Sequence, residues 1–160
     1  MRGLWLGIIA LTFGTGSAAH AQESAGEGIV EEAEGPHHLS LVIGGTHVDQ
    51  ADETAFTLGV DYEYRISELL GVGFVAEHAF GELDSTTLIA AADIHLFEGL
   101  AVQVGPGVEF AEGEEFLMGR LGAVYEFELG NGMTLSPQLH YDFSEGEDAV
   151  VFGAAIGRAF

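Results

Sequence analysis

The chain has 160 residues, the size of one domain, and carries 26 acidic against 4 basic side chains, a formal net charge of −22. This acidic excess excludes nucleic acid as a partner, because phosphate binding needs lysine and arginine. Apolar residues make up 48% of the chain, too many for a disordered protein, and the absence of cysteine excludes disulfides and thiol chemistry.

Residues 1–21 have the features of a secretory signal peptide. Arg2 precedes a compact apolar run at 4–13, and small residues follow, ending in an A-x-A motif at 19–21. The apolar run is shorter than the roughly 20 residues that a membrane-spanning helix needs. We therefore expect the chain to be exported and its signal peptide to be cleaved.

The next segment, 22–37, is rich in glutamate and has no hydrophobic period, which predicts a flexible acidic tail. From 38 to 160 the hydrophobic period is two, which predicts strands. The clearest strand is 55–67. Its apolar face consists of Phe56, Leu58, Val60, Tyr62, Tyr64 and Ile66, and its polar face of Thr57, Gly59, Asp61, Glu63 and Arg65.

Eight such segments follow one another, each of about the 9–11 residues that a tilted membrane-spanning strand needs. The turns expected between them are acidic near 49–54, 81–85, 111–115 and 144–148, and less so near 67–69, 97–99 and 128–133. The sequence therefore predicts an all-β fold, an eight-stranded antiparallel up-and-down transmembrane β-barrel over 38–160. With the N-terminus in the periplasm, the acidic turns lie outside the cell. Pro106 removes a ladder donor and predicts a bulge or kink at 105–107.

Aromatic residues of the apolar face sort into two groups by strand end. The group expected at the outer rim is Phe56, Phe80, Phe110, Tyr141, Phe143 and Phe152, and the group at the periplasmic rim is Tyr62, Tyr64, Tyr125, Phe127 and Phe160. Two such belts are typical of the two interfaces of a bilayer.

The polar face holds the candidate chemistry. Its ionisable residues are Arg65, Arg120, Asp61, Glu63, Glu77, Asp93, His95, Glu109, Glu126, His140 and Asp142. Folding each strand about its turn places Arg120 opposite His140 or Asp142, with Glu109 on the other neighbouring strand. Buried charges need partners, so we expect a charge network that fills the lumen. The surplus of acids leaves a cation path or cation site as the alternative, and the sequence specifies neither a metal nor a cofactor.

These features resemble the small eight-stranded outer-membrane barrels, of the OmpA transmembrane domain and OmpX type. The resemblance rests on the signal peptide, the strand count, the tyrosine-rich alternation and the terminal Phe160. In that family a C-terminal aromatic residue is read by the barrel-assembly machinery, which implies the same role for Phe160. The resemblance also implies a place in the bacterial outer membrane, among lipid and lipopolysaccharide. Arg158 departs from the family pattern, which has an apolar or aromatic residue there.

The leading hypothesis for function is a non-enzymatic structural or envelope-interaction barrel. A narrow barrel for cations or small solutes is the alternative. A lipid-modifying enzyme ranks lower, because the His38-x-Ser40 spacing has no identifiable supporting acid. A soluble lipocalin-like barrel also ranks lower, because it would have to pack the bulky aromatic face inside. At the acidic outer turns, divalent cations that bridge to lipopolysaccharide are weighed against solvated loops without a binding role.

Overall fold

The computed structural model describes residues 35–97 and 99–160, so the expected signal peptide and most of the acidic tail lie outside it. Its strands are β1 (His37–Val48), β2 (Glu53–Arg65), β3 (Leu70–Ala79), β4 (Ser85–Phe97), β5 (Leu100–Ala111), β6 (Glu114–Tyr125), β7 (Phe127–Gly130), β8 (Met133–Ser144) and β9 (Ala149–Ala159). In these two ranges no helix is long and apolar enough to cross a membrane.

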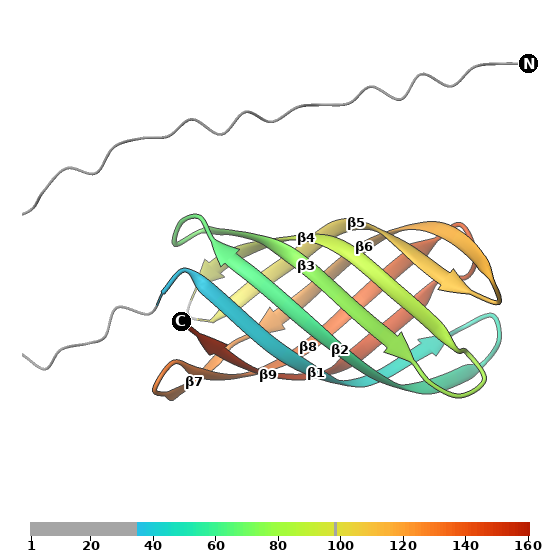
Figure 1. Ribbon diagram of the computed structural model, residues 1–160, viewed down its shortest axis with the longest axis horizontal. Coiled ribbons are helices and arrows are strands. Elements are labelled where there is room, and N and C mark those ends of the chain that lie inside the picture. Colours follow the sequence, from blue (N-terminus) through green and yellow to red (C-terminus); the bar gives the residue numbers. More distant parts are fainter. Residues whose placement is uncertain (1–34, 98) are drawn as a thin grey trace, which may run out of the picture. The chain divides into compact units, whose positions relative to one another are not determined.

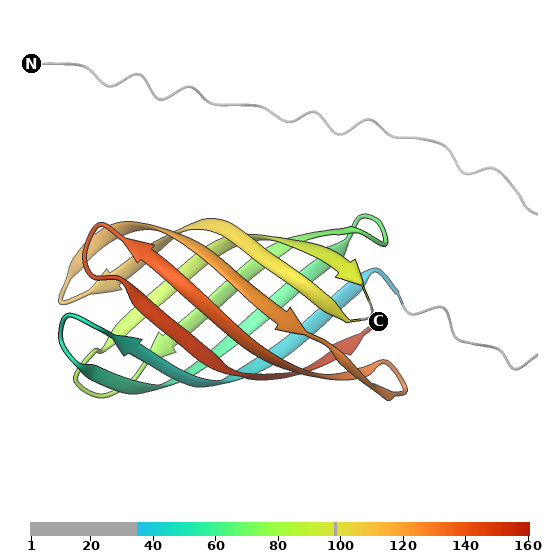
Figure 2. The same ribbon diagram turned by 180° about the vertical axis from the view of Figure 1, so that it is seen from behind.

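All the strands belong to one antiparallel sheet. Its order is β6-β5-β4-β3-β2-β1-β9-β8-β7, and the pairing of β6 with β8 closes it into a barrel (Figures 1 and 2). The short β7 continues β6 after a break at Glu126, and both pair with β8. Counted with β6 and β7 as one strand, the barrel has eight strands, which confirms the predicted fold class.

The turns fall into two sets at opposite ends. β1 begins and β9 ends at one end, called the terminal end below, and the acidic turns lie at the other, the loop end (Figure 1). Two connections are two-residue hairpin turns, Glu112-Gly113 and Asn131-Gly132, and all four residues have positive φ. Such turns match the twist of antiparallel strands and favour Asn-Gly, which explains the sharp reversal at Asn131.

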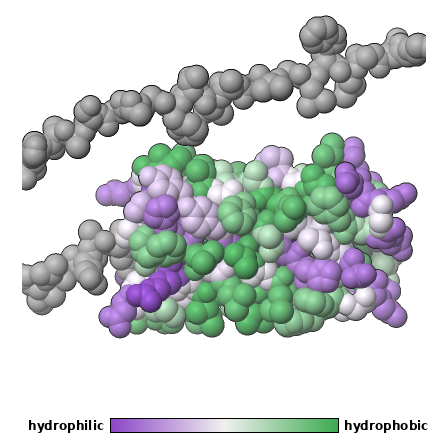
Figure 3. All heavy atoms as spheres, in the orientation of Figure 1, coloured by the Kyte–Doolittle hydropathy of each residue, from purple (hydrophilic) through white to green (hydrophobic). Residues whose placement is uncertain are grey.

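The apolar face points outward. Its large side chains are exposed on every long strand, for example Leu41, Val60, Leu121 and Ile156. The space-filling view shows apolar side chains over the middle of the barrel and hydrophilic ones at both ends (Figure 3). A barrel with the apolar face turned inward, as in the lipocalin-like alternative, is therefore excluded. The outer band instead suits the hydrocarbon of a bilayer.

The irregularity expected around Pro106 is not a bulge. The β4–β5 register is the same on both sides of Pro106, and only the pairs opposite Ala90 and Ala91 are missing. Neither strand gains an extra residue. The two backbones stay close at this point, because the glycine at 105 has no Cβ, which would clash with the carbonyl oxygen of Ala90. The register shift in this pair lies instead between His95 and Phe97.

Candidate functional site in the barrel lumen

Arg120 is the centre of the most buried charge cluster in the lumen. Its side chain is 1% exposed. Nε donates to Oδ1 of Asp142 at 2.7 Å, while Nη2 donates to Oδ2 of Asp142 at 2.7 Å and to Oε2 of Glu77 at 2.6 Å. Asp142 faces Arg120 in the β6–β8 register, whereas Glu77 reaches it from β3. This two-pronged pairing fixes the guanidinium and joins strands that are not neighbours in the sheet.

Apolar side chains fill the lumen beside this cluster. Val75, Ile89, Ala91 and Met118 form one buried group, contributed by β3, β4 and β6. The glycine at 107 leaves room for it, since a Cβ there would meet both Ile89 and Met118. Protein interiors of this kind are close-packed and leave little space for water. The middle of the barrel is therefore a packed core.

The carboxylates of Asp61 and Asp93 meet at Gln103, whose residue is 1% exposed. Nε2 of Gln103 donates to Oδ2 of Asp61 at 3.1 Å and to Oδ1 of Asp93 at 3.0 Å. One neutral amide thus donates hydrogen bonds to two carboxylates, one from β2 and one from β4. Within the described residues, neither carboxylate is within ion-pair distance of an arginine, unlike Glu77 and Asp142.

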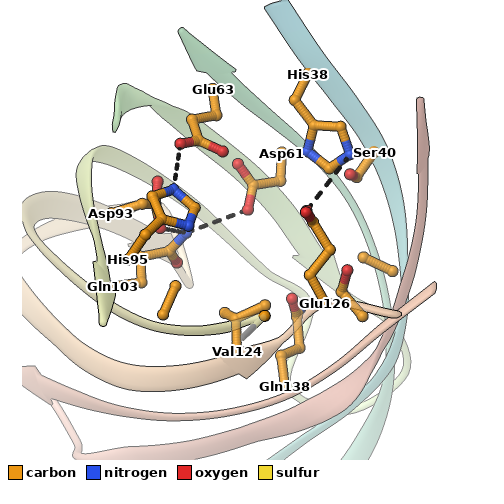
Figure 4. Close-up of a pocket in the computed structure, with 14 residues that line it drawn as sticks. His38, Ser40, Asp61, Glu63, Asp93, His95, Gln103, Val124, Glu126 and Gln138 are labelled. Carbon is orange, nitrogen blue, oxygen red and sulfur yellow. Dashed lines mark hydrogen bonds and ion pairs between the residues drawn. The ribbon is translucent and has the colours of Figure 1, made fainter. Parts of the chain in front are cut away.

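A second charge cluster lies nearer the terminal end. Arg65 pairs with Glu126 at 3.0 Å and more loosely with Glu63 at 3.6 Å. Oε1 of Glu63 also lies 2.7 Å from Nε2 of His95. His38 bonds to Thr134 at 2.9 Å and lies 3.9 Å from Glu126. Figure 4 shows His38, His95, Glu63 and Glu126 around one space, with Asp61 and Asp93 also lining it.

Cavities occupy the two halves of the lumen separately. The terminal half holds an inner cavity of about 30 Å³, lined by the residues of Figure 4. It adjoins two wider spaces at the terminal end, of about 350 and 470 Å³, which share Glu126 with it. The loop half holds a cavity of about 10 Å³ beside Glu77 and Asp142, under a space of about 330 Å³. The cavities next to the packed middle are thus small, and the spaces toward both ends are wider.

The structure places the polar-face residues named from the sequence along the lumen. Of the two residues expected opposite Arg120, it brings Asp142 there, and His140 lies opposite Gly122 instead. Glu109 bonds to Ser144 at 3.1 Å. His140 is buried beside Gly122, and its Nδ1 has no hydrogen-bond partner in the part of the chain that the structure describes. The sequence did not identify Glu77 as a partner of Arg120, since strand order does not say which side chains meet across a lumen. The apolar group was also missed, although Val75 and Ile89 interrupt the polar face.

The aromatic residues of the outer face form contacts within each rim. Phe56 lies against Phe80 and Tyr141 against Phe143 toward the loop end, with ring centroids 6.0 and 4.7 Å apart. Near the terminal end the rings of Tyr125 and Phe127 are 4.7 Å apart. The remaining aromatic residues assigned to the belts lie on the same outer face, namely Tyr62, Tyr64, Phe110 and Phe152.

Phe160 is held at the terminal end of the barrel. Its backbone N–H donates to the carbonyl oxygen of His37 at 2.9 Å, and its own carbonyl accepts from the N–H of His37 at 3.3 Å. The two rings stack with centroids 5.5 Å apart. Nδ1 of His37 also lies 2.8 Å from the hydroxyl of Tyr62. The last residue of the chain is thus joined to the first strand.

Comparison with known proteins gives the fold its context. No protein-family model matches the chain, and no curated protein sequence matches it. Among solved structures, the N-terminal β-barrel domain of Pseudomonas aeruginosa OprF is 13% identical with a TM-score of 0.58, and covers 79% of this chain and 99% of that one. The attachment invasion locus protein Ail of Yersinia pestis is 14% identical with a TM-score of 0.53, over 79% and 99%.

A de novo designed transmembrane β-barrel is equally similar. It is 14% identical with a TM-score of 0.52, and the match covers 82% of this chain and all of the design. Identities this low show the fold alone. The resemblance to small outer-membrane barrels that the sequence suggested is confirmed at that level, and the chain has the fold of a transmembrane β-barrel.

Proposed function

We propose that this chain is an outer-membrane barrel of the bacterial envelope, with a structural or envelope-interaction role and a closed lumen. The fold and the outward apolar band support the membrane location. The signal-peptide pattern at 1–21 supports export, and Phe160 fits recognition by the barrel-assembly machinery. In this orientation the terminal end lies in the periplasm and the acidic loop end faces outward, beside lipopolysaccharide.

The observation that carries the proposal is the filling of the middle of the lumen. Arg120 is held by Glu77 and Asp142 next to the apolar group of Val75 and Met118. An eight-stranded barrel is only wide enough for its own inward side chains. A buried guanidinium that bonds both carboxylates therefore acts as a plug, and the barrel serves the envelope as a rigid body.

A catalytic role finds little support in the geometry. Ser40 is buried and lines the inner cavity together with His38, so both face the lumen. An enzyme that acts on membrane lipid needs its nucleophile on the lipid-facing surface. Glu126 lies 3.9 Å from His38 and already pairs with Arg65. The pair therefore fits a polar lining better than a hydrolytic site.

Cation permeation is the second candidate, and the unpaired Asp61 and Asp93 favour it. Conductance of the refolded mature protein in planar bilayers separates the two. We expect no steady current from the wild type. Replacing the plug by Arg120→Ala should produce flickering, cation-selective current, because the remaining lumen is acidic. The control Arg158→Ala removes the same charge from an exposed position and should stay silent. A large, stable wild-type current would favour permeation over a closed barrel.

A further inference from the structure

Three buried polar side chains in the terminal half of the lumen have no hydrogen-bond partner among the described residues. They are Ser40, Ser136 and Gln138, exposed by 7%, 4% and 8%. Ser40 comes from β1 and the other two from β8, and all three line the inner cavity, where Figure 4 labels Ser40 and Gln138. Buried polar groups are nearly always satisfied by protein or by ordered water. These three side chains are therefore available to a species held in the cavity that they line.

The charges around the same cavity indicate the sign of that occupant. Arg65 pairs with Glu126 and Glu63, whereas Asp61 and Asp93 share the neutral amide of Gln103 and have no arginine partner within 35–97 and 99–160. Buried carboxylates without a cation are unfavourable unless they bind one or take up a proton. An occupant that accepts both carboxylate and neutral oxygen ligands is a hard cation.

We propose that the inner cavity binds one calcium-like cation, between the carboxylates of Asp61 and Asp93 and the neutral oxygens of Ser40, Ser136 and Gln138. Its volume of about 30 Å³ has room for about two water-sized particles, at roughly 10–15 Å³ each. A cation with one retained water fits. In the described ranges no three acidic or imidazole side chains lie close enough to hold a metal by themselves. Neutral oxygens and water therefore complete the shell.

The same features select among cations. Calcium accepts six to eight oxygen ligands in irregular geometry, whereas magnesium demands a regular octahedron and usually keeps several waters. The cavity is too small for a magnesium ion with several waters. The imidazole of His95 is already engaged by Glu63, and that of His38 by Thr134, which disfavours a transition metal.

Access to the site is from the terminal end. The inner cavity shares His38 and Glu126 with the wider space of about 350 Å³ beside Pro36 and Thr134. Toward the loop end, the apolar group and the Arg120 cluster close the way. In the proposed orientation the site is therefore filled from the periplasm. The proposal does not depend on the structural role of the barrel, and a silent wild type in bilayers leaves it unaffected.

Calcium binding by the refolded full mature chain tests the proposal, with CaCl₂ as the probe in titration calorimetry. The lumen variant Asp61→Asn with Asp93→Asn keeps the side-chain volume and removes two charges. The control Glu114→Gln with Glu115→Gln removes two charges from exposed positions at the loop end. We expect one saturable calcium site in the wild type and the control, and at least tenfold weaker binding in the lumen variant. Equal binding by all three proteins, or loss in the control alone, would overturn the proposal.

A second measurement needs no variant. The side-chain amide of Gln138 should shift in NMR spectra on addition of CaCl₂, and ionic-strength-matched NaCl or MgCl₂ should shift it less. Leu139, the next residue on β8, faces outward, and its backbone signal serves as the internal reference. An amide of Gln138 that does not respond to calcium means that the cavity holds water only, and that result refutes the site.

Discussion

Replacing Arg120 by methionine tests the closed lumen most directly. The guanidinium makes three charge-assisted hydrogen bonds of 2.6–2.7 Å to Asp142 and Glu77, and all three side chains are at most 7% exposed. Methionine is unbranched and apolar and replaces the stem of the arginine but not its guanidinium, so the change leaves two buried carboxylates without their arginine partner. Removing one member of a buried ion pair typically costs about 3–5 kcal/mol. We expect the free energy of unfolding of Arg120→Met to fall by that amount.

The remaining carboxylates, and not the lost packing, should account for the cost. The triple variant that adds Glu77→Gln and Asp142→Asn to Arg120→Met removes the stranded charges and should recover most of the stability, since neutral or apolar replacements of buried ion pairs are often nearly neutral. Unfolding by urea in lipid vesicles, followed by circular dichroism, measures all the variants. Arg158→Met, at an exposed position, is the control. The reasoning is refuted if Arg120→Met is as stable as the control, or if the triple variant is no more stable than the single one.

Two further predictions concern the two faces of the sheet. On the outer face, Val60→Arg should lower the free energy of unfolding in lipid by about 2–4 kcal/mol, and Leu69→Arg in the β2–β3 turn by at most about 1 kcal/mol, because the cost of a charge depends on depth; equal costs at both sites would contradict the outward band. In the lumen, Gln103→Met should cost about 1–3 kcal/mol in the same urea assay, because Asp61 and Asp93 lose their shared donor; an unchanged midpoint would show that the amide is not needed.

The strands were predictable because each has lipid on one side and lumen on the other. This demands strict alternation, as in Phe56 to Arg65, and alternation is visible in a single sequence. The turn near 128–133 was also predictable from the sequence, since the Asn131-Gly132 dipeptide favours the positive φ that both residues have. Antiparallel neighbours then follow from chain order, which is why His140 or Asp142 was expected opposite Arg120, and the structure has Asp142 there.

Contacts across the lumen do not follow from chain order. Glu77 contacts Arg120 because the closed barrel brings β3 opposite β6. That arrangement depends on the tilt and stagger of the strands, which the sequence of a single strand does not reveal. The bond from Gln103 to Asp61 of β2 has the same origin, whereas Asp93 faces Gln103 in the β4–β5 register. The apolar group at Val75 and Ile89 was hidden for another reason. A charged lumen was expected there, and two aliphatic residues among many polar ones did not outweigh that pattern.

The contact between His37 and Phe160 allows the proposed assembly role of Phe160 to be separated from its contribution to stability. Stacking of the two rings, at 5.5 Å, is expected to contribute about 0.5–1.5 kcal/mol, so His37→Ala and Phe160→Ala should lower the free energy of unfolding by similar amounts. The proposed assembly role belongs to the ring of Phe160 and not to that of His37. Only Phe160→Ala should therefore slow assembly in vesicles that contain the machinery, as followed by the gel shift between boiled and unboiled samples, while unassisted refolding of the two variants stays alike. Phe152→Ala, an outward aromatic residue on the same strand, is the control and should assemble at the wild-type rate. If His37→Ala slows assisted assembly as much as Phe160→Ala does, then Phe160 acts through closure of the β1–β9 seam and not as a signal.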